Sequence, residues 1–225
     1  MKSRWHLRQW SNADRHRRGN ISVPNSVSLR LSQLGILFPD TNPVSANGAA
    51  WLGSDGPYTN DFENNSGEDV ILVIWGPAGS WVNAITPLIT TPIAAGATQT
   101  ISFANGSSGA WAPVYPDTRR SRYGQIDQTW GEYTFNGASS TVDVSREVNM
   151  NGRPMKIITP KCTSDFTQCV FQCTAGASTC TTGYELFNCQ ASSQPGAHYG
   201  IDLNGAPSGG CGGMGDSAKL TTIFS

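Results

Sequence analysis

The stretch TWGEYTFNGASSTVDVS, residues 129–145, contains two short alternating runs on either side of an Asn-Gly pair. In the first run Tyr133 and Phe135 alternate with polar residues, and in the second run Val142 and Val144 do the same. Alternation with a period of two is typical of a strand with one buried face, and a short polar connection between two such runs is typical of a hairpin. The stretch therefore predicts two antiparallel strands that bury these four side chains together.

The register of this hairpin follows from its buried side chains. Residues paired across an antiparallel ladder share a face, so the two apolar sets lie together only if the loop has an even number of residues, most simply residues 136–139. That register sets Glu132 directly opposite Asp143 on the solvent-facing side, with their Cβ atoms about 4.5–5.5 Å apart. An odd loop would instead pair Asp143 with Tyr133 and bury the carboxylate.

The placement of two carboxylates directly opposite each other needs a physical explanation. Like charges placed directly opposite each other are destabilising unless a cation lies between them, they share a proton, or solvent screens them. Glu132 and Asp143 therefore have two interpretations that stay open at this point, a solvated sheet face and an acidic ligand-binding cleft.

The composition favours an all-β chain. Charged residues make up 14% of the 225 residues, Gly numbers 25 and Pro 13, and no long segment repeats at helical spacing, which fits short strands and many turns. No helices are interposed as they would be in a parallel βαβ sheet. We therefore predict an antiparallel β-sandwich or β-barrel followed by a disulfide-rich C-terminal region of loops. The expected strands cover residues 70–75, 98–103, 110–115, 129–135, 141–145 and 154–158.

The first 50 residues differ from the rest of the chain. They show neither a sustained period nor a cysteine, so we expect residues 1–50 to be a disordered extension and residues 51–225 to be the folded domain. Residues 1–20 hold six of the 15 Lys and Arg and one acid, which leaves nine basic and 15 acidic residues elsewhere, a net charge of −6. An acidic body argues against nucleic acid as a partner.

The six cysteines lie together after residue 161, in a Gly- and Ser-rich part of the chain. An even number predicts three disulfides, whose connectivity the spacing leaves open. Zinc is the alternative, but there is no Cys-x-x-Cys pair and only His198 lies nearby, so we expect neither a metal nor a cofactor. The cysteines are Cys162, Cys169, Cys173, Cys180, Cys189 and Cys211.

Disulfides and three glycosylation sequons, at Asn20, Asn64 and Asn105, indicate a secreted protein. The first 20 residues are basic but lack the apolar stretch of about 7–15 residues found in a signal peptide, so no signal is recognised. The apolar segment at residues 29–39 is interrupted by polar residues and is too short to span a membrane. We expect a monomeric extracellular protein without a membrane span.

The hairpin and the segment after it resemble the thaumatin-like proteins, in which AEFTL leads to DVSLVDGYNLPM. Here EYTF at residues 132–135 is followed by DVS at residues 143–145 and by NGRPM at residues 151–155, one residue longer than the family spacing. Upstream, FENN at residues 62–65 with VILVIWG at residues 70–76 resembles the family's opening strand. The chain is most similar to the short, cysteine-poor secreted fungal members, some of which are regarded as effectors or allergens.

This resemblance implies a thaumatin-like β-sandwich with an acidic cleft. Glu132 and Asp143 match two of the family's cleft acids, whereas another cleft Asp falls on the non-acidic residues 148–149. The cleft Arg that follows Trp in the family has no counterpart after Trp111. The nearest arginines are Arg119, Arg120 and Arg122.

The resemblance further implies a non-enzymatic protein that binds cell-wall β-glucan or another extracellular target, because aromatic rings stack on sugars and carboxylates accept hydroxyl hydrogen bonds. One alternative is a weak endo-β-1,3-glucanase with Glu132 as general acid and Asp143 as nucleophile or base, since carboxyl groups about 5–5.5 Å apart suit a retaining hydrolase. Another is an effector that binds a host protein. The expected ligand-binding residues are Glu132, Asp143, Trp111, Tyr115, Tyr123, Trp130 and Arg122.

Overall fold

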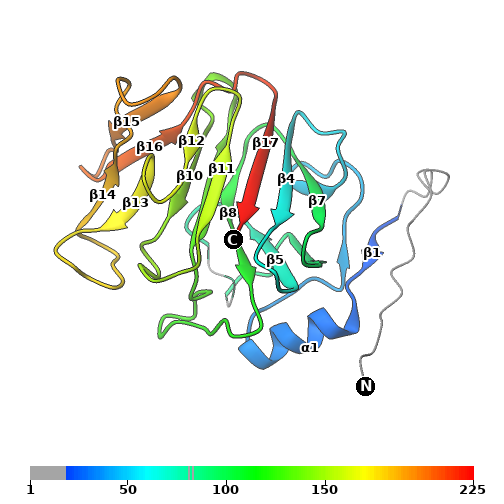
Figure 1. Cartoon of the computed structure of the whole chain (residues 1–225). Coiled ribbons are helices and arrows are strands. Elements are labelled where there is room, and N and C mark those ends of the chain that lie inside the picture. The colour runs from blue at the N-terminus through cyan, green and yellow to red at the C-terminus, as the bar shows by residue number, and fades with distance from the viewer. Residues whose placement is uncertain (1–18, 81, 83) are drawn as a thin grey trace.

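Two β-sheets face each other across a shared core of buried side chains (Figure 1). The structure is a computed structural model and describes residues 19–80, 82 and 84–225. The nine-stranded sheet runs β14(Tyr184–Phe187), β13(Val170–Cys173), β10(Thr141–Ser145), β9(Trp130–Phe135), β8(Ser107–Val114), β5(Val70–Trp75), β6(Ile89–Ile93), with β16(Pro207–Cys211) on β10 and β15(Ala197–Ile201) on β16. The six-stranded sheet runs β12(Thr163–Ser164), β11(Met155–Ile158), β17(Ala218–Phe224), β4(Tyr58–Asn64), β7(Thr98–Phe103), β3(Ala50–Leu52).

The expected all-β sandwich with a disulfide-rich C-terminal region is confirmed, but this region contains the strands β12 to β17 as well as loops. Most strand pairs are antiparallel, as predicted, but β10 pairs with β13 and β4 pairs with β17 in parallel. The second of these pairs brings the C-terminal strand into the middle of the smaller sheet, between β11 and β4. A single turn of 3₁₀-helix, Gly137–Ser139, connects β9 to β10.

Aromatic side chains fill the space between the sheets. Trp111 of β8 lies edge-on to Phe62 of β4, with ring centroids 5.3 Å apart, and stacks on Tyr133 of β9 at 5.5 Å. Tyr58 and Phe135 stack across the same core at 4.5 Å. These contacts join the two sheets through several of the bulkiest side chains in the protein. Each aromatic pair stabilises the fold beyond the contribution of its buried area.

The segment before the sandwich is folded from residue 19 onward, so the expectation of a disordered extension is wrong for residues 19–50. Helix α1(Asn25–Leu34) ends at Gly35, whose φ of +64° suits a glycine. Val27 and Leu31 are four residues apart on one face of α1, and both are buried. A pair of short strands, β1(Ile21–Ser22) and β2(Thr41–Asn42), flanks the helix. Residues 1–18 lie outside the described part of the chain.

A second hydrophobic core lies between this N-terminal segment and the larger sheet. Val27 and Leu31 cluster with Val73 and Trp75 of β5 and with Ala112 of β8. These sheet residues point away from the smaller sheet, and we call this side of the larger sheet the outer face. The sequence did not reveal this core because α1 is ten residues long and its apolar positions are separated by polar and basic residues.

Two arginines form hydrogen bonds between the N-terminal segment and the connection from β8 to β9. Arg30 of α1 donates hydrogen bonds to the backbone oxygens of Pro116 at 2.9 Å and Thr118 at 2.8 Å. In the opposite direction, Arg120 donates to the backbone oxygen of Gly35 at 3.0 Å. The guanidinium groups therefore satisfy carbonyls in both segments.

The C-terminal third contains the three predicted disulfides. Cys162 pairs with Cys211, Cys169 with Cys189, and Cys173 with Cys180. Cys173 lies in β13, Cys211 lies in β16, and the other four cysteines lie in loops next to the strands of this region. These strands are on the side of the molecule away from α1 (Figure 1). All six cysteines are thus used in disulfides.

Candidate functional site

Glu132 of β9 and Asp143 of β10 are directly paired across the antiparallel ladder, so the predicted register is confirmed. Their side chains share the outer face, because the alternate residues of both strands point into the core between the sheets. The buried alternate residues are Tyr133, Phe135, Val142 and Val144, as expected from the sequence.

The expectation that the outer face is open to solvent at this pair is wrong for Asp143, which is only 5% exposed. Strand β16 joins β10 at this point and comes so near that a Cβ atom added to Gly210 would lie 3.2 Å from Oδ2 of Asp143. Oδ1 of Asp143 has no hydrogen-bond partner among the described residues. The carboxyl group is therefore enclosed by a strand that lies more than sixty residues later in the chain.

A third acid, Glu147, belongs to the same cluster and was not predicted. Its backbone oxygen accepts a hydrogen bond from the backbone N–H of Cys180 at 2.9 Å, so the loop closed by the Cys173–Cys180 disulfide lies against it. Asp143, Ser145 and Glu147 occupy alternate positions in the chain. Extending the predicted alternation by two residues past Ser145 would have placed Glu147 on the same face as Asp143. We call Glu132, Asp143 and Glu147 the acidic cluster.

Burial is the first cause of raised pKa values throughout the acidic cluster. The pKa of Asp143 is raised well above its ordinary value by burial and by the nearby charges of Glu132 and Glu147. Burial and the charge of Glu132 raise the pKa of Glu147 to about 8. Burial also raises the pKa of Glu132, while the hydroxyl of Ser145 acts in the opposite direction. A raised pKa favours the protonated form, which lessens the repulsion between the facing acids, and a protonated carboxyl group can donate a hydrogen bond as well as accept one.

A pocket of about 250 Å³ opens on the outer face beside Glu132. The rings of Trp75 and Trp130 meet edge to face, with centroids 4.7 Å apart, and Nε1 of Trp130 donates to the backbone oxygen of Ile126 at 2.8 Å. The Ser80 hydroxyl has no partner among the described residues. The pocket thus combines polar groups with two largely buried aromatic side chains, since Trp75 is 2% and Trp130 8% exposed. Its lining residues are Trp75, Gly79, Ser80, Gly109, Ala110, Gln125, Trp130 and Glu132.

Two of the predicted ligand-binding aromatics lie in the protein interior and not at this pocket. Trp111 is fully buried between the sheets, because it alternates with Ala110 and Ala112 of β8, which occupy the outer face. Tyr115 is also buried, with the guanidinium of Arg153 4.2 Å from its ring centroid, and burial raises its pKa to about 12. The alternation within β8 decides the placement of Trp111, and neither side chain belongs to the pocket lining.

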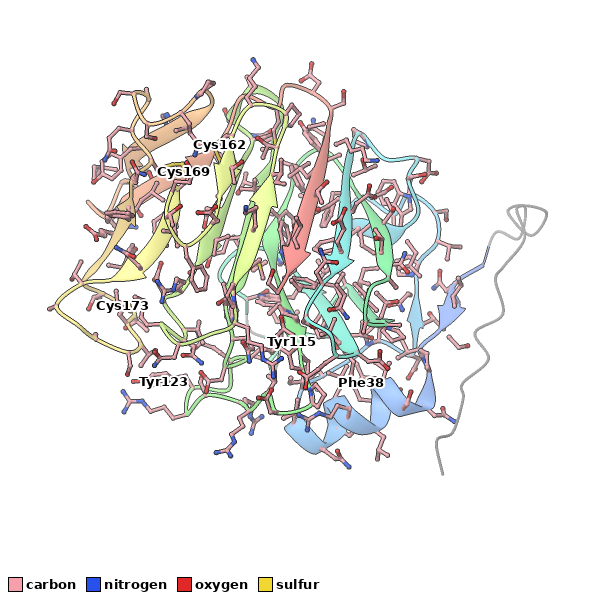
Figure 2. All side chains as sticks on the ribbon, in the orientation of Figure 1. Phe38, Tyr115, Tyr123, Cys162, Cys169 and Cys173 are labelled. Carbon is pink, nitrogen blue, oxygen red and sulfur yellow. A yellow bond between two sulfur atoms is a disulfide. The ribbon has the colours of Figure 1, made fainter. Side chains whose placement is uncertain are left out.

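Apart from the enclosed Asp143, the other predicted residues are divided between the pocket and the surface. Trp130 lines the pocket together with Glu132. Tyr123 and Arg122 are exposed in the connection between β8 and β9, where the guanidinium lies 4.6 Å from the tyrosine ring centroid, and Figure 2 shows Tyr123 at the periphery of the molecule. Gln125, two residues further on, does reach the pocket.

Trp75, Ser80 and Gln125 line the pocket but were not predicted to do so. Trp75 is the last residue of the apolar run in β5, and its even spacing from Val73 places it on the outer face, a signal that the sequence does contain. Ser80 and Gln125 lie in loops, whose paths no periodicity describes.

Two of three comparisons with known proteins give a match. A family model described as the Allergen Asp f 4-like domain matches residues 53–194. Among solved structures, the thaumatin-like xylanase inhibitor TLXI aligns at a TM-score of 0.36 with 13% sequence identity, covering 75% of this chain and 99% of the inhibitor. A comparison with curated proteins finds no match. In the described residues, no helix combines the length and the hydropathy of a transmembrane segment.

Proposed function

The chain belongs to the Allergen Asp f 4-like domain family, and from the pocket beside Glu132 we propose that it is a secreted, non-enzymatic protein that binds β-glucan of a cell wall. The matched residues, 53–194, include every member of the acidic cluster and the whole pocket lining. Three disulfides support secretion, because such bonds form and persist in oxidising compartments. The allergen description of the family agrees with an extracellular protein.

The chemistry of the pocket supports a neutral, hydroxyl-rich ligand. Trp130 offers an apolar ring, while Ser80, Gln125 and Glu132 offer hydrogen-bonding groups around it. A sugar presents both a flat apolar face and hydroxyls that donate and accept, so it matches both kinds of surface. Because Glu132 holds its proton more readily than an ordinary carboxyl group, its pocket does not require a cationic ligand.

One observation favours binding over hydrolysis. Glu132 lines the pocket, whereas Asp143 on the neighbouring strand is only 5% exposed and does not belong to the lining. A glycoside hydrolase needs both carboxyl groups at the scissile bond, one as acid and the other as nucleophile or base. A sugar in this pocket reaches only one carboxyl group, which supports a binding protein.

We predict that Glu132→Ala weakens binding of β-1,3-glucan about tenfold, the loss of about 1.4 kcal/mol. Glu132→Gln should change affinity less than threefold, since the amide keeps one donor and one acceptor. A pull-down on insoluble glucan, with affinity from the depletion of free protein, measures both variants. Glu185→Ala is the matched control, because Glu185 is exposed on β14, away from the pocket lining.

The same samples test the alternative functions. Release of reducing sugars by the unmodified protein, abolished by Glu132→Gln, would establish the hydrolase in place of the binder. Absence of glucan binding by the unmodified protein would overturn the proposed ligand and direct the search to a host protein, the target of an effector.

A further inference from the structure

The three glycosylation sequons occupy very different places in the structure, and we infer that Asn105 carries an N-linked glycan in the secreted protein while Asn64 does not. This inference rests on the secretion proposed above. An N-glycan is bulky and hydrophilic, so its asparagine must lie at the surface of the folded domain. The two sites differ in exposure, in hydrogen bonding and in their position along the strands.

Asn64 is a structural residue of the interior. It is fully buried at the end of β4, and its Nδ2 donates to the backbone oxygens of Glu68 at 2.7 Å and Ile93 at 2.9 Å. Its Oδ1 accepts from both the backbone N–H and the hydroxyl of Ser66, the third residue of its own sequon. A glycosylated amide retains one N–H, so a glycan here would remove a buried hydrogen bond and force a sugar into the core.

Asn105 has the opposite surroundings. It is exposed in the tight turn between β7 and β8, where the backbone N–H of Ser107 donates to the oxygen of Ala104 at 3.3 Å and Gly106 has a φ of +83°. Its Oδ1 accepts from the backbone N–H of Gly137 at 3.1 Å, which orients the side chain. Among the described residues no acceptor takes a hydrogen bond from its Nδ2, so that nitrogen is available for modification without loss of a contact.

The modification is an ordinary transfer onto this nitrogen. Nδ2 of Asn105 forms a bond to the anomeric carbon of an oligosaccharide carried on a lipid diphosphate. The bond from that carbon to the diphosphate breaks, the lipid diphosphate leaves with the electron pair, and the amide gives up one proton. The donor and the transferase belong to the secretory pathway, and the carbonyl oxygen that accepts from Gly137 is unchanged by the reaction.

The glycan at Asn105 would leave the sandwich at its end and not over the pocket. Ser107 pairs with Phe135 and Ala110 pairs with Glu132, so the turn lies three or more residues along the ladder from the pocket. At about 3.4 Å per residue, this is a separation of about 10 Å or more. Glucan binding should therefore be the same with and without the glycan.

The experiment uses the full chain, secreted from a eukaryotic host behind a secretion leader, with Asn20→Gln in every sample so that exposed Asn20 contributes nothing. The intact mass should carry an oligosaccharide increment that a peptide N-glycosidase removes, and Asn105→Gln should lose this increment completely. Asn64→Gln should keep it. The matched control is Asn136→Gln, because Asn136 lies in the adjacent exposed turn in an Asn-Gly-Ala triplet that is not a sequon.

Peptide mapping of the folded, secreted protein decides the outcome independently of these variants. Glycan on Asn105 and unmodified Asn64 support the inference. Glycan on Asn64, or unmodified Asn105 in a host that glycosylates a secreted reference protein, overturns it. Glucan pull-downs on the same samples separate this result from the proposed binding function, because Asn105→Gln is expected to leave binding unchanged.

Discussion

Leu31→Ala is expected to lower the free energy of unfolding by about 2–5 kcal/mol, the range for a large-to-small change in a packed core. Leu31 is fully buried, and it joins α1 to Val73 and Trp75 on the outer face of the larger sheet. Removing its side chain leaves a cavity between the helix and the sheet. Urea unfolding followed by tryptophan fluorescence measures the change.

Leu29→Ala is the matched control on the same helix. Leu29 is 62% exposed, so its truncation should change the free energy of unfolding by about 0.5 kcal/mol or less. A chain that begins at Trp51 lacks α1 altogether and should unfold at markedly lower denaturant concentration than the full chain. Equal stability of the Leu31→Ala and Leu29→Ala variants would show that the N-terminal segment does not contribute to the folded domain.

The free energy of unfolding is expected to fall as pH rises from about 4.5 to about 8, with a slope of up to about 1.4 kcal/mol per pH unit for each proton involved. In the folded protein the pKa of Glu147 is raised by burial and by Glu132, from an ordinary value of 4.5 to about 8. Between these two values the folded state binds a proton that the unfolded chain has released. The stabilisation is therefore fully present below the pKa of the unfolded chain and is lost as pH rises through the pKa of the folded state. Burial raises the pKa values of Asp143 and Glu132 as well, which adds to the effect.

Glu147→Gln should remove a large part of this slope, because the amide does not titrate. Glu185→Gln, at an exposed position on β14, should leave the slope as it is. Urea titrations at half-unit steps of pH provide the measurement. A stability that rises with pH across this window in the unmodified protein would contradict the assignment of buried, protonated carboxyl groups. Tyr184 does not contribute to this pH dependence, because burial and the nearby acids Glu147, Asp202 and Glu132 raise its pKa above its ordinary value of 10.0.

The hairpin shows how much local pattern can predict. The pairing of Glu132 with Asp143 depends on two apolar sets and a loop of even length, all within residues 129–145, and the structure has that pairing. The enclosure of Asp143 depends on β16, whose approach to β10 is a long-range event without a local signal. The sequence therefore predicted the register correctly and the solvent exposure incorrectly.

The sequence predicted some residues of the candidate site and missed others, again according to whether a local pattern describes them. Trp130 and Glu132 lie on one strand, share its outer face and both line the pocket, so the alternation along β9 is a local signal for their proximity. Trp111 and Tyr115 were included because of their residue type, although the alternation along β8 already placed Trp111 on the core side. Helix α1 was missed because two buried positions, Val27 and Leu31, are too few for a clear helical period.

The position of β17 has a consequence for the order in which the protein is made. This strand consists of residues 218–224 and lies between β11 and β4, so the smaller sheet has a gap at its centre until those residues have left the ribosome. During synthesis β4 has its partner on one side only, with Phe62 uncovered by Phe224, whose ring lies 6.1 Å away in the finished fold. A chain whose translation stops before residue 218 would be unable to close its sandwich and would be a substrate for quality control in the compartment where it folds.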